Sequence, residues 1–96
     1  MEQIVHCMEA PFDIYIGRPH PRFPAGSKWA NPFVIGRDGD RTEVIKKFAL
    51  WVPKQPALVK ALGELKGRVL GCWCKSRLDP KPCHGDVLLK LLQTHP

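Results

Sequence analysis

The sequence predicts one small α/β domain that spans residues 1–96. Three observations support this fold class. The length suits a single domain. Hydrophobic residues make up 44% and charged residues 25% of the chain, which is typical of a globular protein. Short β-type segments also alternate with stretches whose apolar residues recur at helical spacing. We therefore expect a short sheet covered by about three helices.

Three segments favour β-strands. Residues 3–8 are short and β-compatible, and residues 12–16 alternate and contain β-branched and aromatic side chains. Ala10-Pro11 lies between them and is compatible with a hairpin connection, although proline argues against a regular two-residue turn. Residues 68–74 are apolar enough to form the central strand of the sheet.

Three segments favour helices, and we expect them over residues 41–52, 56–65 and 86–93. Asp40 is a predicted N-cap, with Glu43 placed to complete a capping box. Pro56 suits the first turn of the second helix. The third helix is leucine-rich and should be nearly all buried. All three helices should pack on the sheet.

Residues 17–39 should lack regular structure, because prolines and glycines recur throughout them. Within this loop, Lys28, Trp29 and Asn31 supply a cation, a flat ring and an amide close together, and Arg18 adds a second cation. This set suits a phosphorylated ring compound. Trp29 is equally suited to anchor the loop in the core.

The net charge of +6 is unevenly distributed. No carboxylate occurs between Asp13 and Asp38, where four basic residues fall, and a second basic group surrounds the last three cysteines. Such clustering favours an anionic ligand, either a small nucleotide-like molecule or nucleic acid. Simple solubility explains the charge equally well.

The most distinctive part of the chain is a cluster of cysteine, histidine and aspartate residues. Cys72 and Cys74 should point to the same face of the predicted strand, because side chains alternate along a strand. Cys83 and His84 follow a basic loop, and Asp86 begins the last predicted helix. The free amides and the dipole of that helix should point into the same region.

Three interpretations of this cluster remain open. Zinc is one, with Cys72, Cys74, Cys83 and His84 as ligands, although C-x-C with an adjacent C-H pair is not the usual spacing. Cysteine chemistry is another, with Cys74 or Cys83 as a thiolate of lowered pKa, His84 as acid or base and Asp86 orienting it. The third is structural, with small buried thiols packed under the loop and with His84 and Asp86 capping the last helix.

No apolar run is long enough to cross a bilayer, and the first residues lack the features of a signal peptide. We therefore expect a cytoplasmic protein with no membrane partner, in which the thiols stay reduced. A domain this small often recruits a metal ion or a second copy of itself, so a homodimer remains open.

Several blocks of the sequence together resemble a known family. They are Tyr15-Ile16-Gly17-Arg18-Pro19, Ser27-Lys28-Trp29-Ala30-Asn31-Pro32-Phe33, Gly71-Cys72-Trp73-Cys74 and Cys83-His84-Gly85-Asp86-Val87-Leu88. Over roughly residues 12–92 the chain resembles domain-of-unknown-function family 4326, which occurs in bacteria and their phages. Ala30 stands where a glycine is expected, and the loop over residues 75–82 is longer than usual. The resemblance implies a phage or bacterial source and no particular reaction.

The working hypothesis is a pocket that binds, and in one interpretation acts on, a nucleotide-like or nucleic-acid ligand. The residues expected to recognise the ligand are Arg18, Lys28, Trp29 and Asn31. The residues expected on the reactive side are Cys74, Cys83, His84 and Asp86. Two other classes remain open: a non-catalytic nucleic-acid-binding module, zinc-stabilised or thiol-packed, and a phage-encoded inhibitor that binds a host protein.

Overall fold

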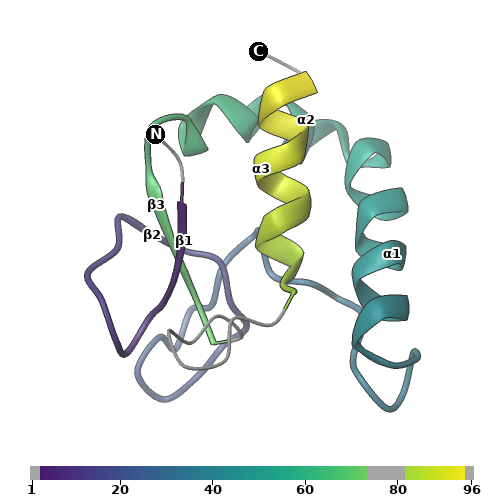
Figure 1. Cartoon of the computed structure of the whole chain (residues 1–96), viewed down its shortest axis with the longest axis horizontal. Helices are drawn as coiled ribbons and strands as arrows, with labels where there is room; N and C mark the ends of the chain where they lie inside the picture. The colour runs from purple at the N-terminus through teal and green to yellow at the C-terminus, as the bar shows by residue number, and fades with distance from the viewer. Residues whose placement is uncertain (1–2, 74–81, 95–96) are drawn as a thin grey trace.

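The computed structural model describes residues 3–73 and 82–94, which form a three-stranded sheet with helices packed beside it (Figure 1). The strands are β1 (Gln3–His6), β2 (Ile14–Tyr15) and β3 (Val69–Cys72). β3 lies between β1 and β2, so the predicted central strand is confirmed. Both outer strands run parallel to it, and Ile4 and Ile14 flank Leu70 in register.

The prediction of a hairpin connection at Ala10-Pro11 is wrong, because β1 and β2 each pair with β3 and not with each other. Residues 7–13 instead carry the chain back to the level at which β3 begins. Two hydrogen bonds hold this return segment there: Asp13 N–H donates to Val69 O, and Val69 N–H donates to Asp13 Oδ2, each at 2.8 Å. Because of this return segment, β2 begins beside the start of β3, and all three strands run in the same direction.

The helices are α1 (Arg41–Trp51), α2 (Pro56–Ala61) and α3 (His84–Thr94), with 3₁₀ turns at Val52–Lys54 and Leu62–Leu65. The predicted capping box at α1 is confirmed: Glu43 N–H donates to Asp40 Oδ1 at 2.8 Å, and Asp40 N–H donates to Glu43 Oε1 at 3.0 Å. Pro56 begins α2 as expected. α3 begins two residues earlier than predicted, because Cys83 caps it.

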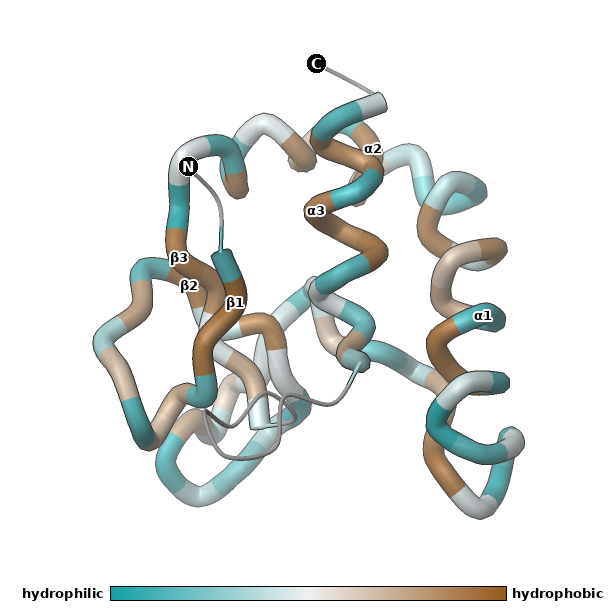
Figure 2. The backbone as a smooth tube through the Cα atoms, in the orientation of Figure 1, coloured by the Kyte–Doolittle hydropathy of each residue, from teal (hydrophilic) through white to brown (hydrophobic). Residues whose placement is uncertain are grey.

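α3 lies between the sheet and α1, and these elements share one core (Figure 1). Figure 2 shows hydrophobic residues along β3 and on both α3 and α1. Leu70 from β3, Phe48 from α1 and Leu88 from α3 are fully buried in this core. Gly85 lets α3 approach the sheet closely, since a Cβ there would lie 2.7 Å from the Ile4 side chain. The start of α3 is therefore pressed against the strands.

Aromatic rings from the loops lie beside the strands at Gly71. A Cβ on Gly71 would lie only 2.6 Å from the Phe12 ring, so a larger residue at this position in β3 would displace that ring. The Phe23 and Tyr15 rings stack with their centroids 4.1 Å apart. No helix in the described part of the chain is long and apolar enough to cross a membrane.

Candidate functional site

A cavity of about 360 Å³ opens at the end of the sheet where the parallel strands finish. Gly17 and Arg18 follow β2 and line it, Cys72 and Trp73 line it from the end of β3, and the first residues of α1 and α3 also contribute. Ligands of α/β proteins bind at the carboxyl ends of parallel strands. The cavity therefore lies where the fold favours a ligand site.

The start of α3 forms one wall of this cavity. Cys83 is the residue before the helix, and its Sγ accepts a hydrogen bond from Gly85 N–H at 3.4 Å. The Cys83 N–H in turn donates to Asp86 Oδ2 at 3.0 Å. The contact with Asp86 is the return half of a capping box, while the Cys83 sulfur caps the N–H of the second helical residue, Gly85. Asp86 is exposed and supports the helix start, and it is not among the residues that line the cavity.

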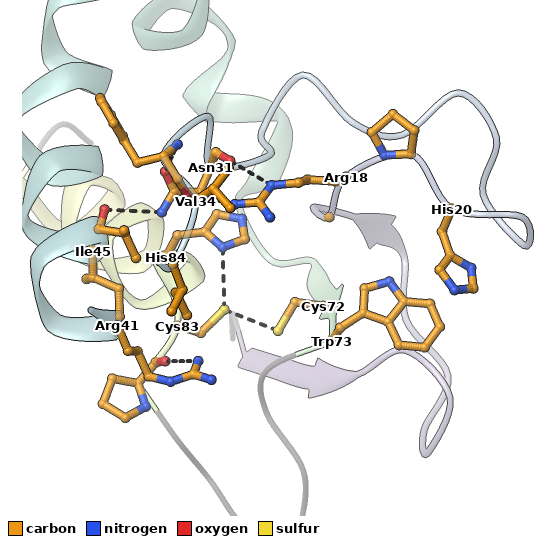
Figure 3. Close-up of a pocket in the computed structure, with 16 residues that line it drawn as sticks. Arg18, His20, Asn31, Val34, Arg41, Ile45, Cys72, Trp73, Cys83 and His84 are labelled. Atoms are coloured by element: carbon orange, nitrogen blue, oxygen red, sulfur yellow. Dashed lines mark hydrogen bonds between the residues drawn. The ribbon is translucent and has the colours of Figure 1, made fainter. Parts of the chain in front are cut away.

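His84 is buried at the first position of α3, and its two ring nitrogens have different partners. Nε2 lies 2.8 Å from Ile16 O, which can only accept, so Nε2 carries a hydrogen. In the neutral ring, Nδ1 then holds the lone pair. Nδ1 lies 3.6 Å from Cys83 Sγ (Figure 3). Among the described residues, the Ile16 carbonyl takes the orienting role that was expected of Asp86.

The Cys72 and Cys83 sulfurs lie 3.2 Å apart at the buried side of the cavity (Figure 3). A disulfide bond is about 2.05 Å long, so this is a contact between thiols. Cys74 lies outside the described residues, and its proposed roles stay predictions. Within residues 3–73 and 82–94, no group of three or more His, Cys, Asp or Glu side chains is arranged to hold a metal ion.

Two arginines reach the cavity, one expected and one not. Arg18 donates from Nε to Asn31 O at 3.1 Å and from Nη2 to Phe33 O at 2.7 Å. Arg41, the first residue of α1, donates from Nη1 to Pro82 O at 3.3 Å. In Figure 3 the two guanidinium groups lie on either side of the Cys83–His84 pair. Backbone carbonyls thus hold both side chains at the cavity.

Asn31 lines the cavity but is only 7% exposed. Its Nδ2 donates to Val44 O at 3.2 Å, and its Oδ1 accepts from Phe33 N–H at 2.9 Å. The amide therefore ties the loop to α1 through Val44 O and stabilises the loop itself through Phe33 N–H. Its main role in this structure is to shape the cavity wall.

Lys28 and Trp29 lie away from the cavity. Trp29 is 2% exposed and belongs to the core, so neither face of its ring is open to a ligand. Lys28 is exposed and forms an ion pair with Glu64 at 2.8 Å. Neither side chain lines the cavity, and we do not include them in the proposed site.

A wall of the cavity is aromatic. The rings of Trp73 and His20 pack with their centroids 4.4 Å apart and their planes 38° apart, and Figure 3 shows them together on one side. Trp73 Nε1–H donates to the Tyr15 hydroxyl at 2.8 Å, and that hydroxyl donates to Arg18 O at 2.6 Å. Burial raises the pKa of Tyr15, and the Trp73 hydrogen bond partly offsets this. Tyr15 therefore stays a neutral donor at neutral pH.

Sequence reasoning missed Arg41, His20 and Trp73. Two of them carried a usable signal: Trp73 lies at the carboxyl end of the predicted central strand, and Arg41 directly follows the predicted N-cap Asp40. The position of His20 depends on how the long loop folds, and no local pattern indicates it.

The fold and the site define a class: a small α/β domain with an arginine- and thiol-lined cavity at the carboxyl end of a parallel sheet. The chain belongs to the family described as Domain of unknown function (DUF4326), whose pattern matches residues 3–94. The resemblance seen in the sequence motifs is thus confirmed over nearly the whole chain.

Two uncharacterised viral proteins are similar to this chain. One, from Acanthamoeba polyphaga mimivirus, is 34% identical over 87 residues, and the match covers 82% of this chain and 65% of the relative. The other is a 12.4 kDa protein from the nrdA-td intergenic region of Enterobacteria phage T4, 35% identical over 95 residues, covering 94% of this chain and 76% of the relative. No solved structure matches the chain.

Proposed function

We propose that the cavity binds a small anionic ligand that carries a planar ring, such as a nucleoside monophosphate. The observation that carries this proposal is the composition of the cavity: two arginines and an aromatic pair surround a buried thiol. No carboxylate is found among the described lining residues. The volume of about 360 Å³ falls in the range of 300–1,000 Å³ that is usual for small-molecule sites.

The anionic group of the ligand would lie near the two guanidinium groups. Arg18 uses two of its N–H groups on backbone carbonyls, which leaves further donors of a rigid, planar fork for an anion. Arg41 is held beside the start of α3 by Pro82 O. The amino ends of α1 and α3 both border the cavity, and helix N-termini favour negative charge.

The ring of the ligand would stack against the Trp73–His20 pair. The pair is preformed, because the Trp73 indole is tied to Tyr15 by a hydrogen bond. Stacking of a base on an aromatic side chain contributes about 1–3 kcal/mol and depends little on which base it is. This aromatic wall therefore favours a ligand with a planar ring, and it does not select a particular base.

The thiol of Cys83 would face the bound ligand with His84 beside it. The Ile16 carbonyl keeps the hydrogen on Nε2, so Nδ1 can accept the thiol proton. The Gly85 N–H and the helix start then favour the thiolate form at Cys83. This arrangement suits nucleophilic chemistry on the ligand, with Cys83 as nucleophile and His84 as base.

Titration calorimetry with a panel of nucleoside monophosphates, and with inorganic phosphate alone, tests the binding proposal. We expect at least one nucleotide to bind, and Arg41→Gln to weaken it by about ten- to a hundredfold, the cost of losing a hydrogen bond to a charged group. Arg68→Gln removes the same charge from an exposed residue outside the cavity and should leave the affinity unchanged. Equal losses in both variants would contradict the proposal.

Two further results would redirect the proposal. If single-stranded oligonucleotides bind and mononucleotides do not, with an affinity that falls steeply as salt rises, the domain is a nucleic-acid-binding module. If elemental analysis finds near-stoichiometric zinc, and the thiols react only after chelation, the cysteines form a metal site. Either result would remove the support for Cys83 as a nucleophile.

A further inference from the structure

The contact between Cys72 and Cys83 has a chemical consequence that does not depend on which ligand the cavity binds. The two sulfurs come from the end of β3 and the start of α3, and they lie 3.2 Å apart. Because a disulfide bond is about 2.05 Å long, they need to approach by only about 1 Å to form one. Both residues line the cavity and each is only 1% exposed, so an exchange partner has to enter the cavity to reach them.

The two thiols differ in their surroundings. Cys83 Sγ accepts the Gly85 N–H at the start of a helix and lies 3.6 Å from His84 Nδ1. Such surroundings favour a thiolate, and the thiolate is the attacking species in thiol–disulfide exchange. Cys72 lies on the central strand, where its backbone is fixed by the sheet. Of the two thiols, Cys83 is therefore the better placed to attack, and Cys72 the better placed to resolve the intermediate.

We propose that Cys72 and Cys83 form a redox-active pair that exchanges with low-molecular-weight disulfides. The Cys83 proton passes to His84 Nδ1, the Cys83 sulfur attacks one sulfur of the disulfide R–S–S–R, and R–S⁻ leaves. Cys72 gives its proton to this first R–S⁻ and attacks Cys83 Sγ. The second R–S⁻ leaves and takes the proton held by His84.

The two cysteines lose two electrons in this exchange, and the small disulfide is reduced to two thiols. Reversal by an excess of R–SH restores both cysteines. Oxidation would also consume the Cys83 thiolate, so the redox state of the pair would switch the proposed nucleophile off and on. Exchange itself requires no nucleotide, which separates this inference from the proposed function.

Incubation of the purified native protein in mixtures of reduced and oxidised glutathione tests the pair. After an acid quench the intact protein should be lighter by two hydrogen atoms, and after alkylation peptide mapping by mass spectrometry should find a Cys72–Cys83 crosslink. Both should disappear when the mixture is made more reducing. A crosslink that joins Cys7 or Cys74 instead, or one that forms only in denaturant, would overturn the proposal.

Two serine variants separate the roles of the thiols. Cys72→Ser should accumulate a glutathione adduct on Cys83, because the resolving thiol is missing. Cys83→Ser should form no adduct on Cys72. Serine is a preferred N-cap, so Cys83→Ser should keep α3 and the melting temperature nearly intact. Adducts on Cys72 in a folded Cys83→Ser variant would contradict the assignment of Cys83 as the attacking thiol.

Discussion

The two most distinctive motifs of the sequence, residues 27–33 and residues 83–86, have different roles in the structure. The first uses its side chains inside the protein: Trp29 fills the core, and Asn31 binds backbone groups at both ends of its amide. The second places Cys83 and His84 at the cavity and keeps Asp86 for the helix start. The first motif frames the cavity, and the second supplies its reactive groups.

This difference shows what a polar or aromatic residue in a motif can signify. The indole of Trp29 and the amide of Asn31 looked like recognition groups because of their chemistry, but a buried polar group must first satisfy its own hydrogen bonds. At α3 the thiol and the imidazole are also satisfied internally, yet they border open space. Substitutions of the buried residues Trp29 and Asn31 should therefore affect stability, while those near residue 83 should affect chemistry.

The largest expected effect comes from Trp29→Ala. The side chain is 2% exposed in the core, so its removal should lower the free energy of unfolding by about 3–5 kcal/mol. Urea unfolding followed by circular dichroism measures this loss. A decrease below about 1 kcal/mol, combined with loss of nucleotide binding, would show that Trp29 is a ligand contact after all.

Asn31→Ala should have the next largest effect. The variant leaves Val44 O and Phe33 N–H without the amide partner in a buried setting, which costs about 1–3 kcal/mol. The same urea experiment applies. If stability is unchanged and nucleotide affinity alone falls, Asn31 belongs with the reactive motif and the contrast between the two segments fails.

A smaller effect is expected from alkaline pH. Burial raises the pKa of Cys7 above its ordinary value of 9.0, and the charge of Cys72 adds to this; burial also raises the pKa of Tyr15 above 10.0. At pH values between the ordinary and the raised pKa of each group, the unfolded chain has released more protons from Cys7 and Tyr15 than the folded chain has. The free energy of unfolding should therefore fall as pH rises above about 9.

Denaturant titrations across this pH range measure the decline. Cys7→Ser and Tyr15→Phe each remove one of the two groups, so each variant should lose stability less steeply with pH than the unmodified protein. Identical slopes in all three proteins would show that neither group contributes to the decline.

The smallest effect is expected for Lys28→Ala. Lys28 and Glu64 form an ion pair with side chains that are 50% and 57% exposed, and such pairs contribute about 0.2–1 kcal/mol. Thermal unfolding should shift little, and nucleotide affinity should not change. A tenfold loss of affinity with normal stability would return Lys28 to the ligand site predicted from the sequence.

Local signals predicted much of the fold. Asp40 and Glu43 form the predicted capping box, Pro56 begins α2, and the apolar run near residue 70 is the central strand. No local pattern predicts that β1 and β2 run parallel, because Ala10-Pro11 by itself is also compatible with a hairpin. The pairing depends on contacts with β3, more than fifty residues further along the chain.

The site was harder to predict than the fold, since it depends on side-chain partners in distant segments. The sequence placed Cys83 and His84 together at a helix start, and the structure has them there. It could not reveal that Ile16 O binds His84, or that Arg41 from another helix reaches the same cavity. Both contacts depend on tertiary packing, so the position of Arg41 after the predicted N-cap Asp40 does not by itself show that its side chain reaches the cavity.

The most direct test of the account compares the rates at which iodoacetamide alkylates Cys83 and Cys7, with and without a saturating nucleoside monophosphate. Cys83 is 1% exposed and lines the cavity, while Cys7 is 8% exposed, lies outside the cavity, and has its pKa raised by burial. We predict that at neutral pH Cys83 reacts about tenfold faster than Cys7, and that the nucleotide slows Cys83 alone. Equal rates for the two thiols, or no protection of Cys83 by any nucleotide of the panel, would contradict the assignment of this cavity as the functional site.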